Sequence, residues 1–110
     1  DEVWLPERHL FSDAANFYAT GLHELVHWSG GKKRLNREMK GKFGSADYAE
    51  EELVAELGSA FLMADLGIEG EVQHESYIAS WLKALKNDKR YIFKAVSAAS
   101  KAHSYLMDKL

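Results

Sequence analysis

The chain has 110 residues, of which 46% are hydrophobic and 28% are charged, with one proline and no cysteine. This length and composition predict a single folded domain and exclude an intrinsically disordered or proline-rich chain. The absence of cysteine excludes disulfides, thiolate zinc sites and cysteine catalysis, and it fits a cytoplasmic protein. No apolar run approaches the ~20 residues of a membrane span, so no membrane partner is expected.

Charge is segregated along the chain behind a formal net charge of -3. Residues 32–46 and 83–110 are basic, whereas residues 47–82 hold nine acids and no base. An acidic stretch of this kind is either a solvated face or the surroundings of a cation. The basic stretches could contact phosphate, a further domain or solvent, but Phe43 alone does not make a stacking platform for nucleic acid.

Hydrophobic periodicity and capping signals predict the elements in chain order. Residues 1–6 could form one short strand, which the proline would end. The first helix is expected to begin near Ser12 or Asp13, to carry a buried apolar stripe and to end at the glycine pair 30–31. Residues 32–46 are expected to form a loop.

Three further helices are predicted downstream. A capping box at residues 47–50 starts the second helix, which closes at Gly67 and Gly70. The third helix covers residues 73–86, and the fourth follows Asp88. The fourth helix is expected to bury a stripe formed by Ile92, Val96, Ala99, His103 and Leu106. The predicted fold class is therefore mainly α, an α+β arrangement of about four helices with a minimal β contribution.

The segment His23-Glu24-Leu25-Val26-His27 reads H-E-x-x-H within the first predicted helix. Histidines four residues apart lie on one helix face, so both imidazoles can bind one metal ion. Zn²⁺ suits nitrogen and oxygen ligands and keeps one position open for water in catalytic sites. We therefore predict a metal site on this helix, with His23 and His27 as ligands and Glu24 as the general base. Two packed core histidines beside an exposed glutamate are the alternative.

A third ligand must come from elsewhere in the chain. The metzincin pattern, H-E-x-x-H-x-x-G-x-x-H, is excluded because Lys33 occupies the third histidine position. In the next predicted helix, Glu52 and Glu56 share a stripe beside the core face, where an unpaired carboxylate would be costly. We predict Glu52 as the ligand and Glu56 as the residue that orients a histidine, or as the alternative ligand. Glu50 and Glu51 are expected to be solvated acids at the start of the helix.

Seven segments recur together in one known family of proteins. They are Tyr18-Ala19-Thr20, His23-Glu24-Leu25-Val26-His27-Trp28, Arg34-Leu35-Asn36-Arg37, Glu51-Glu52-Leu53-Val54-Ala55-Glu56-Leu57, Tyr77-Ile78-Ala79-Ser80-Trp81-Leu82, Leu85-Lys86-Asn87-Asp88-Lys89-Arg90 and Ile92-Phe93. With these segments, nearly the whole chain resembles the zincin-like C-terminal domain of ArdC-type antirestriction proteins. The resemblance implies a metallopeptidase-like domain that conjugative plasmids and other mobile elements carry to protect incoming DNA from host restriction.

The resemblance also implies roles for individual residues. It makes His23 and His27 metal ligands, Glu24 the general base, and an acid within residues 51–56 the third ligand. After the tryptophan, family members have a Thr-Gly-His-like segment where this chain has Ser29-Gly30-Gly31, so any role of that histidine is lost. Family members place a single-stranded-DNA-binding domain N-terminal to this one. The chain opens at Asp1, so we expect residues 1–110 to be one domain excised from a longer protein, with DNA bound only through the absent part.

Tyr77 is predicted to donate a hydrogen bond to an oxyanion, with a core-edge tyrosine beside Trp81 as the alternative. His74 is a further candidate for that role, and His103 is expected to be a packing residue. The expected function is zinc-dependent hydrolysis of an unidentified peptide or protein, with Mn²⁺ or Fe²⁺ as other metals that suit the ligands. The alternatives are a non-proteolytic, DNA-associated antirestriction module with a structural metal, and a metal-free helical packing domain.

Overall fold

The computed structural model describes residues 3, 5, 14–37, 45–68, 72 and 74–109, and these residues form four helices and no strand. The helices are α1 (Ala14–Ser29), α2 (Ala46–Leu66), α3 (His74–Ala84) and α4 (Lys89–Lys109). The prediction of a mainly α fold with about four helices is confirmed. The strand expected over residues 1–6 is not formed at Val3 or Leu5, and its other residues lie outside the described ranges. Within those ranges, none of the helices has the length and apolar character of a membrane span.

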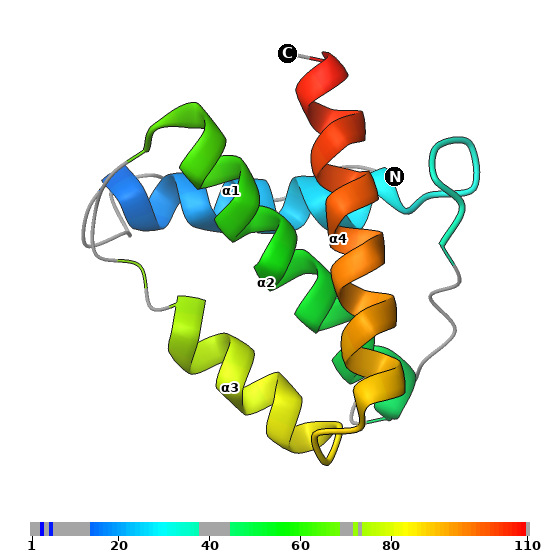
Figure 1. The fold of residues 1–110 in the computed structure, drawn as a ribbon. Coiled ribbons are helices and arrows are strands. Elements are labelled where there is room, and N and C mark those ends of the chain that lie inside the picture. Colours follow the sequence, from blue (N-terminus) through cyan, green and yellow to red (C-terminus); the bar gives the residue numbers. More distant parts are fainter. Residues whose placement is uncertain are drawn as a thin grey trace.

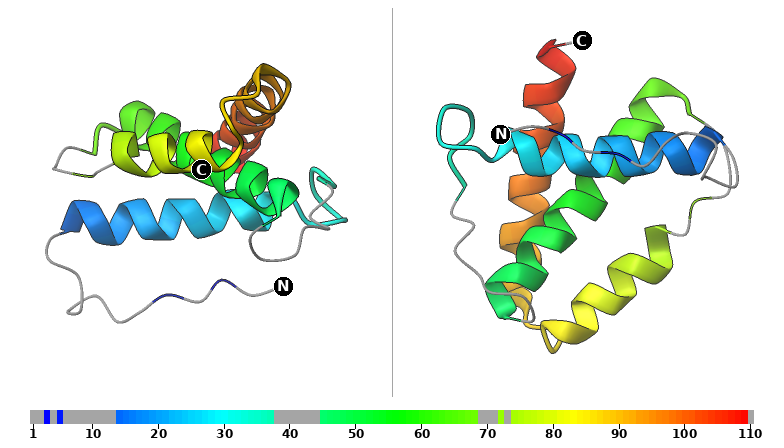
Figure 2. Two further views of the ribbon diagram at one scale, coloured as in Figure 1. Left: turned by 90° about the horizontal axis from the view of Figure 1, so that it is seen from below. Right: turned by 180° about the vertical axis from the view of Figure 1, so that it is seen from behind.

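The central helix of the fold is α2. It crosses the molecule diagonally in Figure 1 and packs against each of the other three helices. Figure 2 shows α1 as a layer of its own, running beneath the layer that contains α2, α3 and α4. The H-E-x-x-H segment of α1 is therefore placed against the first half of α2, where the predicted carboxylates lie.

A shared apolar core holds α1, α2 and α4 together. Its largest fully buried side chains include Val26 from α1 and Leu53 and Leu62 from α2. α1 and α2 are in close contact at Gly58 of α2, where a Cβ would lie 2.8 Å from Cγ2 of Val26. Glycine at this position therefore lets α1 and α2 approach each other.

The face that α4 buries agrees only in part with the predicted stripe, which it shares at Ala99 and Leu106. The buried residues of α4 are Ala95, Ala99, Ala102 and Leu106. Val96 is 40% exposed, so the prediction that it packs in the core was wrong. Small side chains allow α4 to lie close to α2, and this close packing leaves the larger Val96 at the surface.

The ends of the helices follow local hydrogen bonding. The N-cap of α2 is Ser45, whose side chain accepts a hydrogen bond from the backbone N–H of Tyr48 at 3.2 Å. The predicted capping box at residues 47–50 was therefore two residues too late. α2 ends at Gly67, as predicted, in the left-handed conformation with φ 67°. The predicted signals at Ser12, Asp13 and Gly70 lie outside the described residues.

Candidate metal centre

His23 and His27 lie one turn apart on the face of α1 that meets α2. Their Nε2 atoms are 3.2 Å apart, and their rings contact each other edge to face with centroids 4.9 Å apart. About a fifth of each side chain is exposed, at 20% and 21%. Both imidazoles thus aim their Nε2 atoms at one place that solvent can reach.

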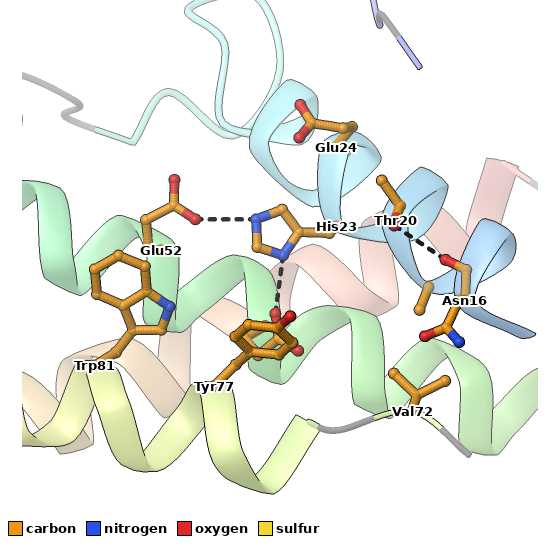
Figure 3. A pocket seen from close by; sticks show the side chains of 10 residues that line it. Asn16, Thr20, His23, Glu24, Glu52, Val72, Tyr77 and Trp81 are labelled. Atoms are coloured by element: carbon orange, nitrogen blue, oxygen red, sulfur yellow. Dashed lines mark hydrogen bonds and ion pairs between the residues drawn. The ribbon is translucent and has the colours of Figure 1, made fainter. Parts of the chain in front are cut away.

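Glu52 of α2 brings a carboxylate to the same place. Its Oε2 lies 3.0 Å from Nε2 of His23, and its Oε1 lies 3.3 Å from Nε2 of His27. Figure 3 shows His23 and Glu52 facing each other between the two helices. One potential ligand atom from each of these three residues lies within 4.8 Å of the other two. The structure therefore brings together the three residues that the sequence singled out as ligands.

A second carboxylate holds the other ring nitrogen of each histidine. Nδ1 of His23 is 3.1 Å from Oε2 of Glu56, and Nδ1 of His27 is 2.7 Å from Oε2 of Glu51. A neutral imidazole has one proton, and a carboxylate beside Nδ1 keeps the proton on that nitrogen. The lone pair is then on Nε2, which is the arrangement usual for histidines that bind a metal.

Glu51 differs from the solvated acid that the sequence predicted. Only 13% of its side chain is exposed, because it contacts His27 on one side and the guanidinium of Arg37 on the other. Glu50 is also buried, with 8% of its surface exposed and Oε1 3.8 Å from Nζ of Lys94. The prediction of two solvated acids at this end of α2 was therefore wrong.

Glu56 joins His23 to a further histidine. While its Oε2 contacts His23, its Oε1 lies 2.8 Å from Nδ1 of His74. Nε2 of His74 is 3.4 Å from the sulfur of Met63. His74 therefore holds Glu56 in place, and both of its ring nitrogens are engaged away from the Nε2 atoms of the site.

The carboxylates and histidines change one another's protonation. Burial lowers the pKa of His23 and His27, but the hydrogen bonds and charges of their glutamate partners outweigh it and raise the pKa of each to about 9. Burial raises the pKa of Glu52 and Glu56, but the adjoining histidines outweigh it and lower the pKa of each to about 2. At neutral pH a metal must therefore compete with protons for this cluster.

The chemistry of the donors fits a divalent cation. When each neutral imidazole carries its proton on Nδ1, the two Nε2 lone pairs and the carboxylate of Glu52 face one another at distances of 3.0 to 3.3 Å. Acceptors this close repel one another unless a proton or a cation lies among them. Two imidazoles and one carboxylate, with room for a further ligand, suit Zn²⁺ and also permit Mn²⁺ or Fe²⁺.

A pocket of about 360 Å³ opens beside His23 and Glu52 (Figure 3). Glu24 lines it from α1 and Tyr77 from α3. Among the described residues, Glu24 has no hydrogen-bonding or ion-pairing partner, in contrast to the three glutamates of α2 around the histidines. Tyr77 is 57% exposed and forms a wall of the pocket. The remaining lining residues are Asn16, Ala19, Thr20, Glu56, Val72 and Trp81.

Sequence reasoning missed two residues beside the site, Arg37 and Tyr48. Arg37 lies in the basic stretch 32–46, for which the sequence predicts a loop, and also in the Arg34–Arg37 segment that carries the family resemblance. Tyr48 packs edge to face on Trp81 with centroids 5.9 Å apart. Burial raises the pKa of Tyr48, and the charge of Glu52 and a hydrogen bond to it act in the same direction. No spacing rule would have found either residue, because each depends on how separate segments meet.

Comparison with known proteins relates the chain to a family and to named relatives. The family model described as zincin-like metallopeptidase matches residues 1–98. The Escherichia coli protein named DNA primase TraC is 44% identical over 108 residues, which cover 97% of this chain and 8% of TraC. The uncharacterized protein y4eC of Sinorhizobium fredii is 48% identical over 108 residues, which cover 96% of this chain and 35% of y4eC. The chain thus spans only a minor part of the length of these relatives.

Two crystal structures of the antirestriction protein ArdC from plasmid R388 share the fold. The Mn(II)-bound structure matches with a TM-score of 0.70 and 47% identity, covering 90% of this chain and 37% of ArdC. The metal-free structure matches with a TM-score of 0.70 and 46% identity, covering 94% of this chain and 38% of ArdC. The resemblance to ArdC-type antirestriction proteins that the sequence indicated is confirmed.

Proposed function

The chain belongs to the zincin-like metallopeptidase family, and we propose that it is a metal-dependent peptidase domain whose ion is bound by His23, His27 and Glu52. The observation that carries the proposal is that one potential ligand atom from each of these residues lies within 4.8 Å of the other two, beside an open pocket. The donor set favours Zn²⁺, while Mn²⁺ or Fe²⁺ would suit the same ligands. The Mn(II) ion in the similar ArdC structure supports a divalent cation.

The residues of the pocket supply the acid–base chemistry of peptide hydrolysis. A bound cation would polarise the scissile carbonyl and lower the pKa of a water molecule. Glu24 takes a proton from the attacking water and passes it to the leaving amine, a role that its carboxylate suits because it lines the pocket and is not paired with any residue that the structure describes. Tyr77 donates its O–H to the carbonyl oxygen as negative charge develops there.

The biological setting that we propose follows the likeness to ArdC. The domain would act in the cytoplasm as part of an antirestriction protein of a mobile element, on a peptide or protein substrate. Single-stranded DNA would be bound by another part of a longer protein. The high identity to ArdC, 47% across 90% of this chain, supports this setting.

A second candidate function is a DNA-associated antirestriction module whose metal is structural. The contacts between α1 and α2 favour it, because each of the two histidines on α1 is held by two carboxylates of α2. Such a network would fix the two helices relative to each other whether or not any peptide bond is cleaved.

The substitution Glu24→Gln separates these two functions. If Glu24 is the general base, E24Q keeps wild-type affinity for Zn²⁺ and loses about 10²–10⁴-fold in the rate of hydrolysis. Digestion of a library of unstructured peptides, followed by mass spectrometry of the new chain ends, measures that rate. The matched control is Glu75→Gln, which changes an exposed acid in the first turn of α3 and is expected to have no effect.

The outcomes of this experiment differ for the two candidates. Cleavage by E24Q at the wild-type rate would overturn the mechanism. A wild-type chain that binds Zn²⁺ and cleaves no peptide would instead favour the binding module. In that case E24Q would also leave protection of incoming DNA unchanged in a restriction assay with the full-length protein.

A further inference from the structure

Arg37 is a cation that the proposed function leaves without a role. It belongs to the basic stretch that the sequence assigned to solvent, to phosphate or to another domain. Yet only 12% of its side chain is exposed. A cation this far removed from water requires partners for its charge and for its N–H groups, and these partners lie beside the candidate metal centre.

The turn after α1 brings Arg37 back alongside that helix. The backbone N–H of Leu35 donates to the carbonyl of Ser29 at 2.9 Å, and that of Arg37 donates to the carbonyl of Gly30 at 3.0 Å. Between them, Asn36 adopts the left-handed conformation with φ 53°, which asparagine tolerates better than most residues. The chain therefore reverses within a few residues and directs Arg37 toward the C-terminal part of α1.

All three guanidinium nitrogens of Arg37 donate hydrogen bonds. Nε donates to Oε1 of Glu51 at 2.9 Å, and Nη2 donates to Oε2 of Glu51 at 3.0 Å. Nη2 also donates to the carbonyl oxygen of Val26 at 2.7 Å, and Nη1 donates to Oγ of Ser29 at 3.2 Å. This fork binds both oxygens of one carboxylate and ties it to α1, which the point charge of a lysine cannot reproduce.

The carboxylate that Arg37 holds is the one that contacts His27. Oε2 of Glu51 lies 2.7 Å from Nδ1 of His27, while the same oxygen accepts from Arg37. With both oxygens fixed by the guanidinium, the carboxylate of Glu51 cannot rotate away from the imidazole. A continuous path of hydrogen bonds therefore runs from Arg37 through Glu51 to His27, whose Nε2 faces the site.

We propose that Arg37 is a positioning residue of the metal centre, acting through Glu51 to hold the ring of His27 in its metal-binding orientation. The inference rests on the proposed metal site and goes beyond it, since it assigns a role to a residue outside the ligand set. Loss of a group that orients a ligand typically costs 10–100-fold in metal affinity. We expect a loss of about tenfold for Arg37, which acts one step further from the ion.

The test is a double-mutant cycle on Zn²⁺ affinity, measured by competition with a chelator at constant pH. The single variants are Arg37→Gln and Glu51→Gln, and the cycle is closed by the double variant. We expect R37Q to weaken Zn²⁺ binding about tenfold in the wild-type background and to have no further effect in the E51Q background. Arg37→Lys, which keeps the charge and loses the fork, is expected to recover only part of the affinity.

A matched control comes from the same basic stretch. Arg34 lies over the ring of Trp28, 4.0 Å from its centroid, and donates from Nε to the carbonyl of Trp28. We expect Arg34→Gln to leave Zn²⁺ affinity unchanged. Thermal unfolding in EDTA reports separately on the fold, and R37K remains informative if R37Q does not fold.

Three results would overturn the inference, and they are distinguishable. Equal Zn²⁺ affinity of R37Q and the wild-type chain would remove Arg37 from the metal centre and leave the proposed metal site intact. An equal loss from R37Q in both backgrounds would show that Arg37 acts through the fold and not through Glu51. A folded wild-type chain that binds no Zn²⁺ would refute the proposed metal site and this inference together.

Discussion

At the scale of single residues, the contacts of the candidate site determine which ring nitrogen of each histidine carries a proton, as well as where the potential ligand atoms lie. Glu51 and Glu56 hold the Nδ1 positions of the two histidines, so that the Nε2 atoms converge on Glu52. The same carboxylates make the metal-free cluster a set of ion pairs. Protonation should therefore govern the stability of the metal-free chain and its readiness to bind metal.

We predict that the metal-free chain is most stable between about pH 4.5 and 6.5. Folding raises the pKa of His23 and His27 from 6.5 to about 9, so their contribution is complete below pH 6.5 and is lost as pH rises through about 9. Folding lowers the pKa of Glu52 and Glu56 from 4.5 to about 2, so their contribution is present above pH 4.5 and is lost as pH falls through about 2.

Urea denaturation in EDTA at a series of pH values measures this profile. His23→Gln is expected to flatten the alkaline side, because it removes one of the two groups that lose a proton there. A free energy of unfolding that stays constant from about pH 6.5 to 9 in the wild-type chain would contradict the ion pairs that the structure contains.

Tyr77 provides a second prediction at this scale. Because its ring is mostly exposed and lines the pocket, Tyr77→Phe should leave the unfolding temperature and Zn²⁺ affinity unchanged. If the hydroxyl stabilises the developing oxyanion, the peptidase kcat falls about 10²-fold. An unchanged kcat would exclude that role, and a large fall in unfolding temperature would instead favour the core-edge alternative.

The sequence allowed part of this site to be predicted. The relative positions of His23, Glu24 and His27 follow from helix geometry within one segment, so spacing is sufficient. The burial of Glu51 could not be predicted, because acids at the start of a helix are usually solvated. The burial of Glu51 depends on its contact with Arg37. A turn brings Arg37 to Glu51, and the sequence of that turn has no periodic pattern from which its conformation could be predicted.

At the scale of the helices, the distance between α1 and α2 determines whether histidines and carboxylates can meet. Gly58 and Val26 lie where these helices touch, and Val26 immediately precedes His27 in the chain. The carbonyl of Val26 also accepts a hydrogen bond from Arg37. Helix packing and the geometry of the candidate site are therefore coupled at this contact.

We predict that Gly58→Ala destabilises the chain by about 1 kcal/mol and weakens Zn²⁺ binding. Alanine improves helix propensity by about 1 kcal/mol, but overpacking a close contact costs about 1–3 kcal/mol. The new Cβ would lie 2.8 Å from Cγ2 and 3.0 Å from Cγ1 of Val26, a side chain that is fully buried. Urea denaturation and a Zn²⁺ titration measure the two effects.

The control for this prediction is Gly21→Ala in α1. A Cβ at Gly21 would lie 3.6 Å from Cδ1 of Leu5, which is an ordinary contact. We therefore expect G21A to stabilise the chain by up to about 1 kcal/mol through helix propensity. If G58A stabilised the chain as much as G21A, this result would contradict the close contact between α1 and α2 at Gly58.

Periodicity located the helices better than it identified their buried faces. The pattern predicted α4 but assigned Val96 to its core face, because large apolar residues define a hydrophobic stripe. The structure buries Ala99, as predicted, but adds Ala95 and Ala102 in place of Val96, and these small residues allow close approach to α2. Which stripe is buried depends on the shape of the neighbouring helix, and a single helix sequence does not contain that information.

At the scale of the whole molecule, the acidic stretch 47–82 divides into two parts. Asp47 and Glu75 are exposed, in agreement with a solvated face, whereas Glu51 and Glu56 are turned toward the histidines of α1. The solvated-face interpretation is therefore confirmed for Asp47 and Glu75, and the cation interpretation stays a prediction for the acids beside the histidines. The buried acids are balanced by the histidines, Arg37 and Lys94, and a divalent cation would complete this balance.

The most direct test of the metal site is a Zn²⁺ titration of the metal-stripped wild-type chain beside His23→Ala and His103→Ala. His103 is the control, because it lies on α4 with Nε2 2.6 Å from Oδ2 of Asp65. We predict about one tightly bound Zn²⁺ per chain for the wild type and H103A, and none for H23A, by calorimetry and elemental analysis. A folded wild-type chain without Zn²⁺, or an H23A chain with wild-type stoichiometry and affinity, would contradict the site.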